Sequence, residues 1–412
     1  PGNTVMLSLD IKLQKMVEDM FGERRGALVA IDPKTGEVLA FVSKPTFDPN
    51  LFVEGIDTES WKELSESIDK PLLNRALRGT YPPGSTYKPF MALAALHSGK
   101  RAPSVVVNDP GFYMFAGHRF GSPEGNIGGV DMRRAIQLSS NIYFYSLANE
   151  MGVDLIHDEM KPLGFGQITG IDLGGEVRGV LPSQEWKRNA YKRPEAKKWY
   201  AGETISLGIG QGYNSFTMLQ LAQATAIVAD GGLRHKPHLV LATRDSVSGQ
   251  TTPIVQPPPD NLGYTPANIA VIRDGLQAVV SAGTARGVFA GAGYQAAGKT
   301  GTAQAVTQAQ GTKYNARALE EHQRDHALFM AFAPAADPKI AVAVIVENAG
   351  WGAGAAAPIA RRVFDYWLMN QYPSEADMEA IKTGKATAPI GKPRVASEIA
   401  WPAVSATPAA AP

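Results

Sequence analysis

A serine followed three residues later by a lysine stands at the start of an apolar helical pattern. Ser85 follows a Pro-Pro-Gly break, and Lys88 opens the apolar run that ends at Leu96. Three residues are nearly one helical turn, so the lysine amine is expected on the same face as the serine. The N-terminus of a helix favours negative charge developing beside that hydroxyl. A desolvated lysine close to another cation has a lowered pKa and can take the serine's proton, which predicts a nucleophile activated without histidine.

The same spacing also occurs where no chemistry is expected. Ser67 and Lys70 repeat it, but a polar run precedes Ser67 and no apolar helix follows Lys70. For Ser85 and Lys88 the ordinary alternative is an N-capping serine with a solvated lysine. The pair alone therefore does not decide between catalysis and a helix cap.

A second serine lies two residues before an amide, where another apolar helical pattern begins. Ser139 and Asn141 belong to the run Leu138–Phe144. By itself such a run is typical of an N-cap. It bears on catalysis only if Ser139 can relay a proton beside Lys88 while Asn141 holds a substrate amide.

The tripeptide Lys-Thr-Gly occurs three times, so it identifies nothing unaided. Its copies begin at Lys34, Lys299 and Lys382. Lys34 falls in a predicted turn and Lys382 lies close to the C-terminal tail, whereas small residues surround Lys299. Small residues are typical of a strand edge where a ligand approaches the backbone. We therefore select the copy that begins at Lys299 and continues with Thr300, Gly301 and Thr302.

Periodicity predicts the elements that position these residues. Apolar residues at i, i+3, i+4 and i+7 predict a helix over Asp10–Met20, a strand-like run over Val5–Leu9 precedes it, and Ile359–Met369 predicts a closing helix. Apolar runs around turn residues predict two hairpins, 27–31 with 38–42 and 327–333 with 340–346. Strands at both chain ends predict an α/β fold, in which helices cover both faces of an antiparallel sheet of about five strands. Lys299–Ala305 should line its cleft.

Domain boundaries follow from where helical and low-complexity patterns change. The mostly helical middle, about 85–232, is expected to form a second lobe, and residues 1–384 to form one domain. The Ala/Pro-rich segment 385–412 is predicted to be a flexible tail. The strand-like run begins so close to Pro1 that we expect a domain excised from a longer protein.

Composition excludes several classes of function. The 412 residues include 40 Lys and Arg, 39 Asp and Glu, and no Cys, with a net charge of +1. Such a chain has no long-range field for nucleic acid, no disulfide and no thiolate. No apolar run approaches the roughly 20 residues that span a bilayer.

The three fragments come in the order Ser-x-x-Lys, Ser-x-Asn and Lys-Thr-Gly-Thr, and this triple is far more specific than any member. It resembles the motif set of penicillin-binding proteins and serine β-lactamases. Further stretches, 47–52, 74–76, 81–86, 109–111 and 208–213, extend the resemblance over nearly all of residues 4–370. They are most similar to penicillin-binding protein 2, the class B monofunctional D,D-transpeptidases of rod-shape elongation in Gram-negative bacteria.

The resemblance implies a penicillin-binding transpeptidase fold and a serine acyl-enzyme. Ser85 would attack the penultimate D-Ala carbonyl of a stem peptide, with Lys88 as base and Ser139 passing the proton to the leaving amine. Backbone N–H groups of Ser85 and Thr302 would form the oxyanion hole. Asn141 would bind the peptide amide, and the terminal carboxylate would be held by Lys299, Thr300 and Thr302. β-Lactams would mimic D-Ala-D-Ala and trap the serine.

The resemblance also implies a cellular setting. Family members carry a cytosolic tail, one membrane helix and a pedestal domain ahead of the transpeptidase. Residues 1–384 would then be an excised transpeptidase domain that acts at the periplasmic face of the inner membrane. Its partners would be peptidoglycan stem peptides and, in the full-length protein, a SEDS-family (RodA-type) glycosyltransferase with other elongation-complex proteins. Nucleic acid is not an expected partner, and no cofactor is implied.

A metal site is not expected. Some relatives are thought to hold zinc with acidic residues, a histidine and a cysteine. Asp109, His118 and Asp131 are present, but Ser140 stands where a thiolate would be needed. His235 and His238, spaced i and i+3 across a proline, are interpreted as structural.

A basic segment with interspersed aromatic residues allows two interpretations. It contains Lys187, Arg188, Lys192, Arg193, Lys197 and Lys198, together with Trp186, Tyr191, Trp199 and Tyr200. The first is a solvated face. The second is a contact with anionic substrate, lipid head groups or the polymerase partner.

Two rival functions use the same serine and lysine. A serine β-lactamase or D-Ala-D-Ala carboxypeptidase would hydrolyse its ester, although the chain length weighs against a β-lactamase. A β-lactam sensor would keep the acylable serine without turnover. The lifetime of a penicillin adduct separates the hydrolases from the other two.

Overall fold

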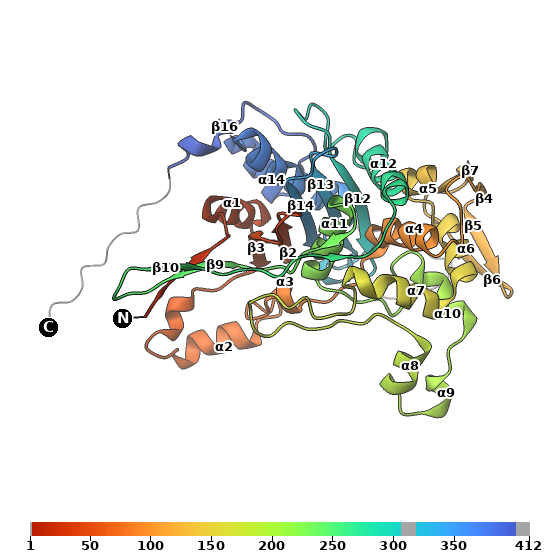
Figure 1. The fold of residues 1–412 in the computed structure, drawn as a ribbon, viewed down its shortest axis with the longest axis horizontal. Coiled ribbons are helices and arrows are strands. Elements are labelled where there is room, and N and C mark those ends of the chain that lie inside the picture. Colours follow the sequence, from red (N-terminus) through yellow and green to blue (C-terminus); the bar gives the residue numbers. More distant parts are fainter. Residues whose placement is uncertain (1, 306–318, 401–412) are drawn as a thin grey trace.

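A five-stranded antiparallel sheet forms the centre of the molecule. The computed structural model describes residues 2–305 and 319–400 (Figure 1). The strand order is β12 (Ala297–Ala303), β13 (His326–Ala333), β14 (Ile340–Val346), β2 (Gly26–Ile31) and β3 (Val38–Lys44), and each neighbouring pair is antiparallel. Both predicted hairpins and the five-stranded sheet built from both chain ends are therefore confirmed.

Helices cover both faces of this sheet, and as a result β2 and β14 are buried along their whole length. The packing helix on one face is α11 (Met218–Ala229). On the other face lie α1 (Ile11–Phe21) and α14 (Ala357–Met369), which contact each other. Asp10 caps α1 by accepting the N–H groups of Lys12 and Leu13, each at 3.0 Å. The predicted first and closing helices thus both form.

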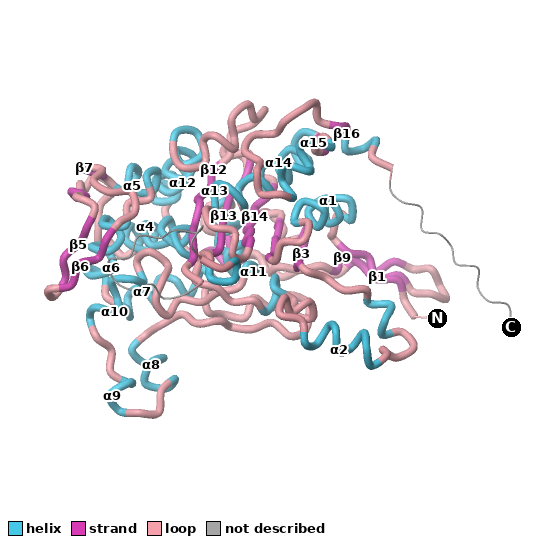
Figure 2. Tube along the Cα trace, turned by 180° about the vertical axis from the view of Figure 1, so that it is seen from behind, coloured by secondary structure: helices cyan, strands magenta, loops and turns pink. Residues whose placement is uncertain are grey.

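The second lobe is mostly helical and packs beside the β12 edge of the sheet (Figures 1 and 2), but α11, which lies within the expected range 85–232, covers the central sheet instead. Its helices are α4 (Lys88–His97), α5 (Met132–Leu138), α6 (Asn141–Met151), α7 (Val153–Met160), α8 (Gln184–Ala190), α9 (Pro194–Lys197) and α10 (Ala201–Leu207). Helix α12 (Pro266–Ala282) joins it by packing on α4 and α5. Two short strand pairs cap the lobe: β4 (Val107–Asp109) with β7 (Gly128–Val130), and β5 (Phe112–Phe115) with β6 (His118–Gly121).

The opposite end of the molecule carries a small sheet and short helices. Strand β1 (Thr4–Leu7) pairs with β9 (Val240–Arg244), which also pairs with β10 (Thr251–Pro253). Helix α2 (Thr58–Glu66) lies at this end, whereas α3 (Arg75–Arg78) packs on β2 and β3 just before the serine loop, and β8 (Leu233–Arg234) pairs with β11 (Asp260–Asn261) beside α11. Among the described helices, none combines the length and the apolar character that a bilayer crossing requires.

The C-terminal segment packs against α1 and α14, on the face of the sheet that these two helices cover. Helix α15 (Glu375–Lys382) is followed by β16 (Arg394–Val395), which pairs with β15 (Gln371–Tyr372). The buried guanidinium of Arg362 donates to Asp377 of α15 at 2.6 Å. The predicted tail, 385–412, thus includes a hydrogen-bonded strand, and its residues 401–412 lie outside the described residues.

Candidate active site

Ser85 lies in a tight 3₁₀ turn, η2 (Gly84–Tyr87), which leads directly into α4. Helix α4 therefore begins at Lys88, and Ser85 lies at its N-terminal end, in the turn that precedes the first helical residue. Gly84 has φ 55°, and a Cβ atom there would lie 2.4 Å from the carbonyl oxygen of Thr302 on β12. This close approach, together with the left-handed φ, requires glycine at the position. The close packing of Gly84 on Thr302 places the half-buried Ser85 next to β12.

Lys88 is fully buried at the start of α4. Its Nζ atom donates to the Ser139 carbonyl at 2.6 Å, to Ser139 Oγ at 3.1 Å and to Asn141 Oδ1 at 2.6 Å. Burial lowers the pKa of Lys88 to about 8, and the negative charges of Glu124 and Asp109 oppose that shift. A lysine with such a pKa can accept a proton near neutral pH. In the described part of the chain no side-chain hydrogen bond joins the Ser85 hydroxyl to the Lys88 amine, although the Lys88 backbone N–H bonds to the Ser85 carbonyl.

Ser139 lies at the junction of α5 and α6 in a left-handed conformation, φ 61° and ψ 37°. The N-cap of α6 is its neighbour Ser140, whose Oγ accepts the Tyr143 N–H at 3.1 Å and donates to buried Asp109 at 2.6 Å. Because Ser140 makes the cap, the side chain of Ser139 is free to face Lys88. A non-glycine residue in this conformation costs about 1 kcal/mol or more and marks a position held by its surroundings.

Lys299 approaches the same hydroxyl from β12, which is an edge strand of the central sheet. Its buried Nζ donates to Ser139 Oγ at 2.9 Å and to the Thr300 carbonyl at 3.1 Å. Burial, and after it the positive charge of Lys88, lower the pKa of Lys299 well below its usual value. Two lysine amines from different lobes therefore converge on one serine oxygen.

The remaining residues of the Lys-Thr-Gly-Thr segment contact three other parts of the chain. Thr300 Oγ1 lies 2.8 Å from Thr284 Oγ1, just beyond the end of α12. A Cβ atom at Gly301 would lie 2.8 Å from Thr86 of the serine turn. The half-buried Thr302 accepts at its carbonyl from Gln211 Nε2 at 3.1 Å.

Sequence reasoning gave no role to Gln211 or Thr284. Gln211 belongs to the Gly-rich segment 208–212, which also accepts the Gly84 N–H at the carbonyl of Gly210, 3.0 Å away. A polar residue between two glycines after a helix was the available signal for Gln211. Thr284 carried none, because only the fold places it beside Thr300.

The residues considered for a metal do not form one cluster. Asp109 is buried against Ser140, Asp131 caps α5 by accepting the Arg134 N–H, and His118 is exposed on β6. Within residues 2–305 and 319–400, no group of three or more His, Asp and Glu side chains is gathered to hold an ion.

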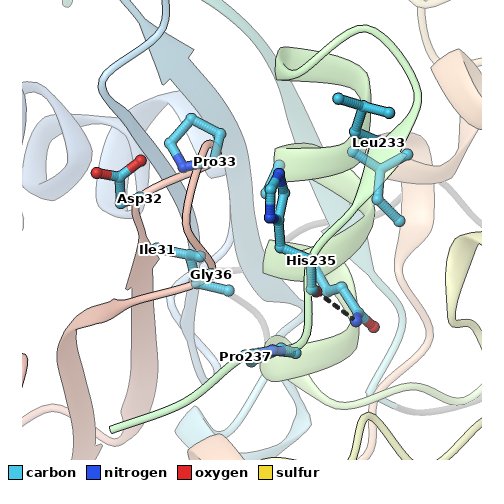
Figure 3. Close-up of a pocket in the computed structure, with 10 residues that line it drawn as sticks. Ile31, Asp32, Pro33, Gly36, Leu233, His235 and Pro237 are labelled. Atoms are coloured by element: carbon cyan, nitrogen blue, oxygen red, sulfur yellow. Dashed lines mark hydrogen bonds between the residues drawn. The ribbon is translucent and has the colours of Figure 1, made fainter. Parts of the chain in front are cut away.

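A separate small pocket lies between the β2–β3 turn and the segment that follows α11 (Figure 3). None of the predicted site residues lines it. His235, which does, has its Nε2 2.9 Å from Asp230 Oδ2, while His238 Nδ1 lies 3.1 Å from the Lys236 carbonyl. Both contacts tie the histidines to their own local segment.

A model described as the penicillin binding protein transpeptidase domain matches residues 26–365. The chain belongs to the penicillin-binding protein transpeptidase family. The matched range runs from β2 into α14 and so contains the serine turn, both lysines and the whole central sheet.

Curated relatives of this chain are peptidoglycan D,D-transpeptidases named MrdA. The chain is 46% identical over 376 residues to that of Acinetobacter baumannii, covering 90% of this chain and 54% of the relative. It is 38% identical over 375 residues to that of Escherichia coli K12, covering 89% and 58%. The chain therefore spans little more than half the length of these relatives.

Solved structures of similar fold carry the name penicillin-binding protein 2. The Pseudomonas aeruginosa protein in complex with WCK 5153 is 45% identical, with a TM-score of 0.79, covering 90% of this chain and 79% of that one. The Helicobacter pylori protein in complex with MreC is 29% identical, with a TM-score of 0.77, covering 89% and 64%.

Proposed function

We propose that this chain is the catalytic domain of a peptidoglycan D,D-transpeptidase that acts through an acyl-enzyme on Ser85. The observation that carries the proposal is the convergence of Lys88 and Lys299 on Ser139 Oγ, at 3.1 and 2.9 Å. Each of the three sequence motifs contributes one of these side chains. The serine turn that precedes Lys88 packs against the strand that carries Lys299.

The proposed acylation uses the neutral form of Lys88. Ser85 Oγ bonds to the carbonyl carbon of the penultimate D-Ala while its proton passes to the lysine amine. The tetrahedral intermediate collapses as the C–N bond to the last D-Ala breaks. The proton reaches the leaving amine through Ser139, which already accepts a hydrogen bond from Lys88. The amine of a second stem peptide then attacks the ester and releases Ser85.

The proposed oxyanion hole joins the N–H groups of Ser85 and Thr302. Support comes from the contact between the two backbones: a Cβ atom on Gly84 would lie 3.3 Å from Thr302 N. Preorganised N–H donors of this kind typically supply a large part of acyl-transfer catalysis. Asn141 is proposed to bind the peptide amide. Lys299, Thr300, Gly301 and Thr302 are proposed to hold the terminal carboxylate.

The cellular setting is proposed from the relatives. A Helicobacter pylori penicillin-binding protein 2 is solved with MreC, and another similar structure is part of a peptidoglycan synthase complex that coordinates polymerization and crosslinking. We propose that residues 1–384 act as one transpeptidase domain in such an elongation complex. Its partner would be a RodA-type glycosyltransferase, and its place the periplasmic face of the inner membrane.

Labelling with a fluorescent penicillin tests the chemistry. Ser85→Ala should abolish labelling without lowering the melting temperature. Ser67→Ala is the matched control, because Ser67 has the same spacing to a lysine but lies at the end of α2, where it accepts the Asp69 N–H. Labelling that survives Ser85→Ala and disappears with Ser67→Ala would refute the assignment.

The lifetime of the adduct tests the reaction class. A transpeptidase must shield its ester from water until an amine arrives, so one intact penicillin G should remain on the Ser85 peptide for many minutes by mass spectrometry. Recovery of unmodified protein within seconds, with hydrolysed drug accumulating, would assign a hydrolase instead. Transpeptidase and sensor are separated by cross-linking of lipid-linked peptidoglycan in the presence of its polymerase.

A further inference from the structure

A short basic arm projects from the helical lobe. We define the basic arm as residues 184–200, which contain α8 and α9 and lie away from the rest of the lobe in both views (Figures 1 and 2). It carries six Lys or Arg residues against two Glu, whereas the whole chain has a net charge of +1. Positive charge is therefore concentrated in this arm.

One of the six cations is buried where the arm joins the lobe. Lys187 is buried, and its Nζ donates to both carboxylate oxygens of Glu203, at 2.5 and 2.6 Å. The same Nζ lies 5.5 Å from the ring centroids of Trp199, Tyr200 and Tyr213. Lys187 is thus neither part of a solvated face nor available to a partner, which corrects its grouping with the other basic residues. It fixes the arm to the lobe.

The contacts of Lys187 are next to a segment that reaches the candidate active site. The Tyr213 hydroxyl donates to Glu203 Oε1 at 2.9 Å, and Tyr213 directly follows the segment 208–212. Within that segment Gln211 donates to the Thr302 carbonyl. The base of the arm is therefore joined, through Glu203 and Tyr213, to the segment that contacts the strand carrying Lys299.

The other five cations are exposed and unpaired. They are Arg188, Lys192, Arg193, Lys197 and Lys198. Across the described residues, none of them forms an ion pair, although Lys198 Nζ lies 5.4 Å from the Tyr200 ring. Two aromatic rings lie among them with broad exposure, Tyr191 at 38% and Tyr200 at 50%. Unpaired cations beside exposed rings suit a ligand that has both carboxylates and flat apolar faces.

We propose that the basic arm is a docking site for a peptidoglycan strand, with its cations on the stem-peptide carboxylates and its tyrosines against the sugar rings. The inference rests on the proposed function, because it takes the polymer processed at Ser85 as the ligand beside it. Each exposed ion pair is weak, so binding depends on several pairs acting along one polymer. The arm would hold the strand while its stem enters the cleft.

A membrane surface fits the same charge less well. Helices that lie in a bilayer interface present a continuous apolar face. Helix α8 has 7 residues and α9 has 4, and residues 184–200 contain no Leu, Ile, Val, Met or Phe. The indole rings of Trp186 and Trp199 pack on Tyr213, at centroid distances of 5.1 and 5.8 Å. These two indole rings are thereby packed inward and are not presented for insertion into lipid.

A charge-reversal pair of variants tests the proposal. The arm variant replaces Lys192, Arg193 and Lys197 with Glu. The control variant replaces Lys62, Lys385 and Lys392 with Glu, which changes the net charge equally at exposed positions on α2 and the C-terminal segment. Ser85 is first blocked with penicillin, so that stems cannot bind through the cleft. Binding to soluble uncross-linked strands is then measured by fluorescence anisotropy at about 50 and 300 mM NaCl.

The arm variant should bind strands at least about tenfold more weakly than wild type at low salt, because three favourable pairs become repulsive. The control variant should bind as wild type does, and wild-type binding should fall as salt rises. Equal binding by both variants would overturn the proposal, and so would wild-type binding to anionic phospholipid vesicles but not to strands. Both variants should react with penicillin at the wild-type rate. Absence of that reaction in wild type would refute the proposed function. The difference in strand binding between the arm variant and the control variant does not depend on that reaction, because both variants keep Ser85 unchanged.

Discussion

Acylation of Ser85 is expected to rise with pH along the titration of Lys88. Its amine must be neutral to accept the serine's proton, and burial lowers its pKa from 10.5 to about 8. Because the pKa is lowered, the amine loses its proton, and becomes able to act as a base, at a lower pH than an ordinary lysine does. At pH 7 about a tenth of the amine is then neutral, whereas an ordinary lysine would be neutral in only about three molecules in ten thousand.

The size of the effect follows from that pKa. Between pH 6.5 and 8.5 the neutral fraction of Lys88 rises from about 3% to about 75%, so the rate constant for acylation should increase about 25-fold. Above about pH 9 the rate should level off. With an unshifted lysine it would instead rise about 100-fold over the same interval and continue to rise.

Stopped-flow acylation by a fluorescent penicillin measures this profile. Lys88→Arg is the matched variant, because arginine keeps the positive charge but does not deprotonate in this range. It should lose acylation by about a thousandfold or more at every pH. A wild-type rate that climbs without a plateau to pH 10, or an Arg variant that retains the wild-type profile, would refute Lys88 as the base.

Three further results are expected. Gly84→Ala should lower the free energy of unfolding by about 2 kcal/mol or more and slow acylation, because its Cβ would lie 2.4 Å from the Thr302 carbonyl oxygen. The control is Gly99→Ala, at φ 72° with no atom within 4 Å of its Cβ, which should cost only about 1 kcal/mol in thermal or urea unfolding. Lys187→Met should cost about 2 kcal/mol by the same measurement, because it leaves Glu203 unpaired, and adding Glu203→Gln should restore part of the loss. EDTA should change neither the melting temperature nor penicillin labelling, and a loss restored by zinc would contradict that expectation.

Much of the sheet and of the candidate site could be predicted because local patterns encode it. The run 340–346 is apolar at every position, and its strand is buried on both faces in the structure. The spacing of Ser85 and Lys88 also carried correct information, since the Lys88 N–H bonds back to the Ser85 carbonyl across one turn. These features depend on residues close together in the chain.

The features that could not be predicted depend on contacts between distant segments. The need for glycine at position 84 arises because the turn packs against Thr302, which lies far along the chain. Which of two adjacent serines caps α6 depends on the left-handed Ser139, held there by amines from α4 and β12. Lys187 looked like one more surface cation, and only the fold supplies Glu203 as its partner.

The pairing of β2 with β14 has a consequence for how the chain acquires its fold. Gly26–Ile31 is buried throughout, but its partner Ile340–Val346 is synthesised roughly 300 residues later, about 15 to 60 s at ordinary elongation rates. Until then the β2–β3 hairpin exposes an unpaired apolar edge, which is a site for misassembly. Contacts of such high sequence separation also slow folding. The catalytic geometry therefore forms late, after nearly the whole chain is available, and a chain that stops before residue 340 should collapse without a working site.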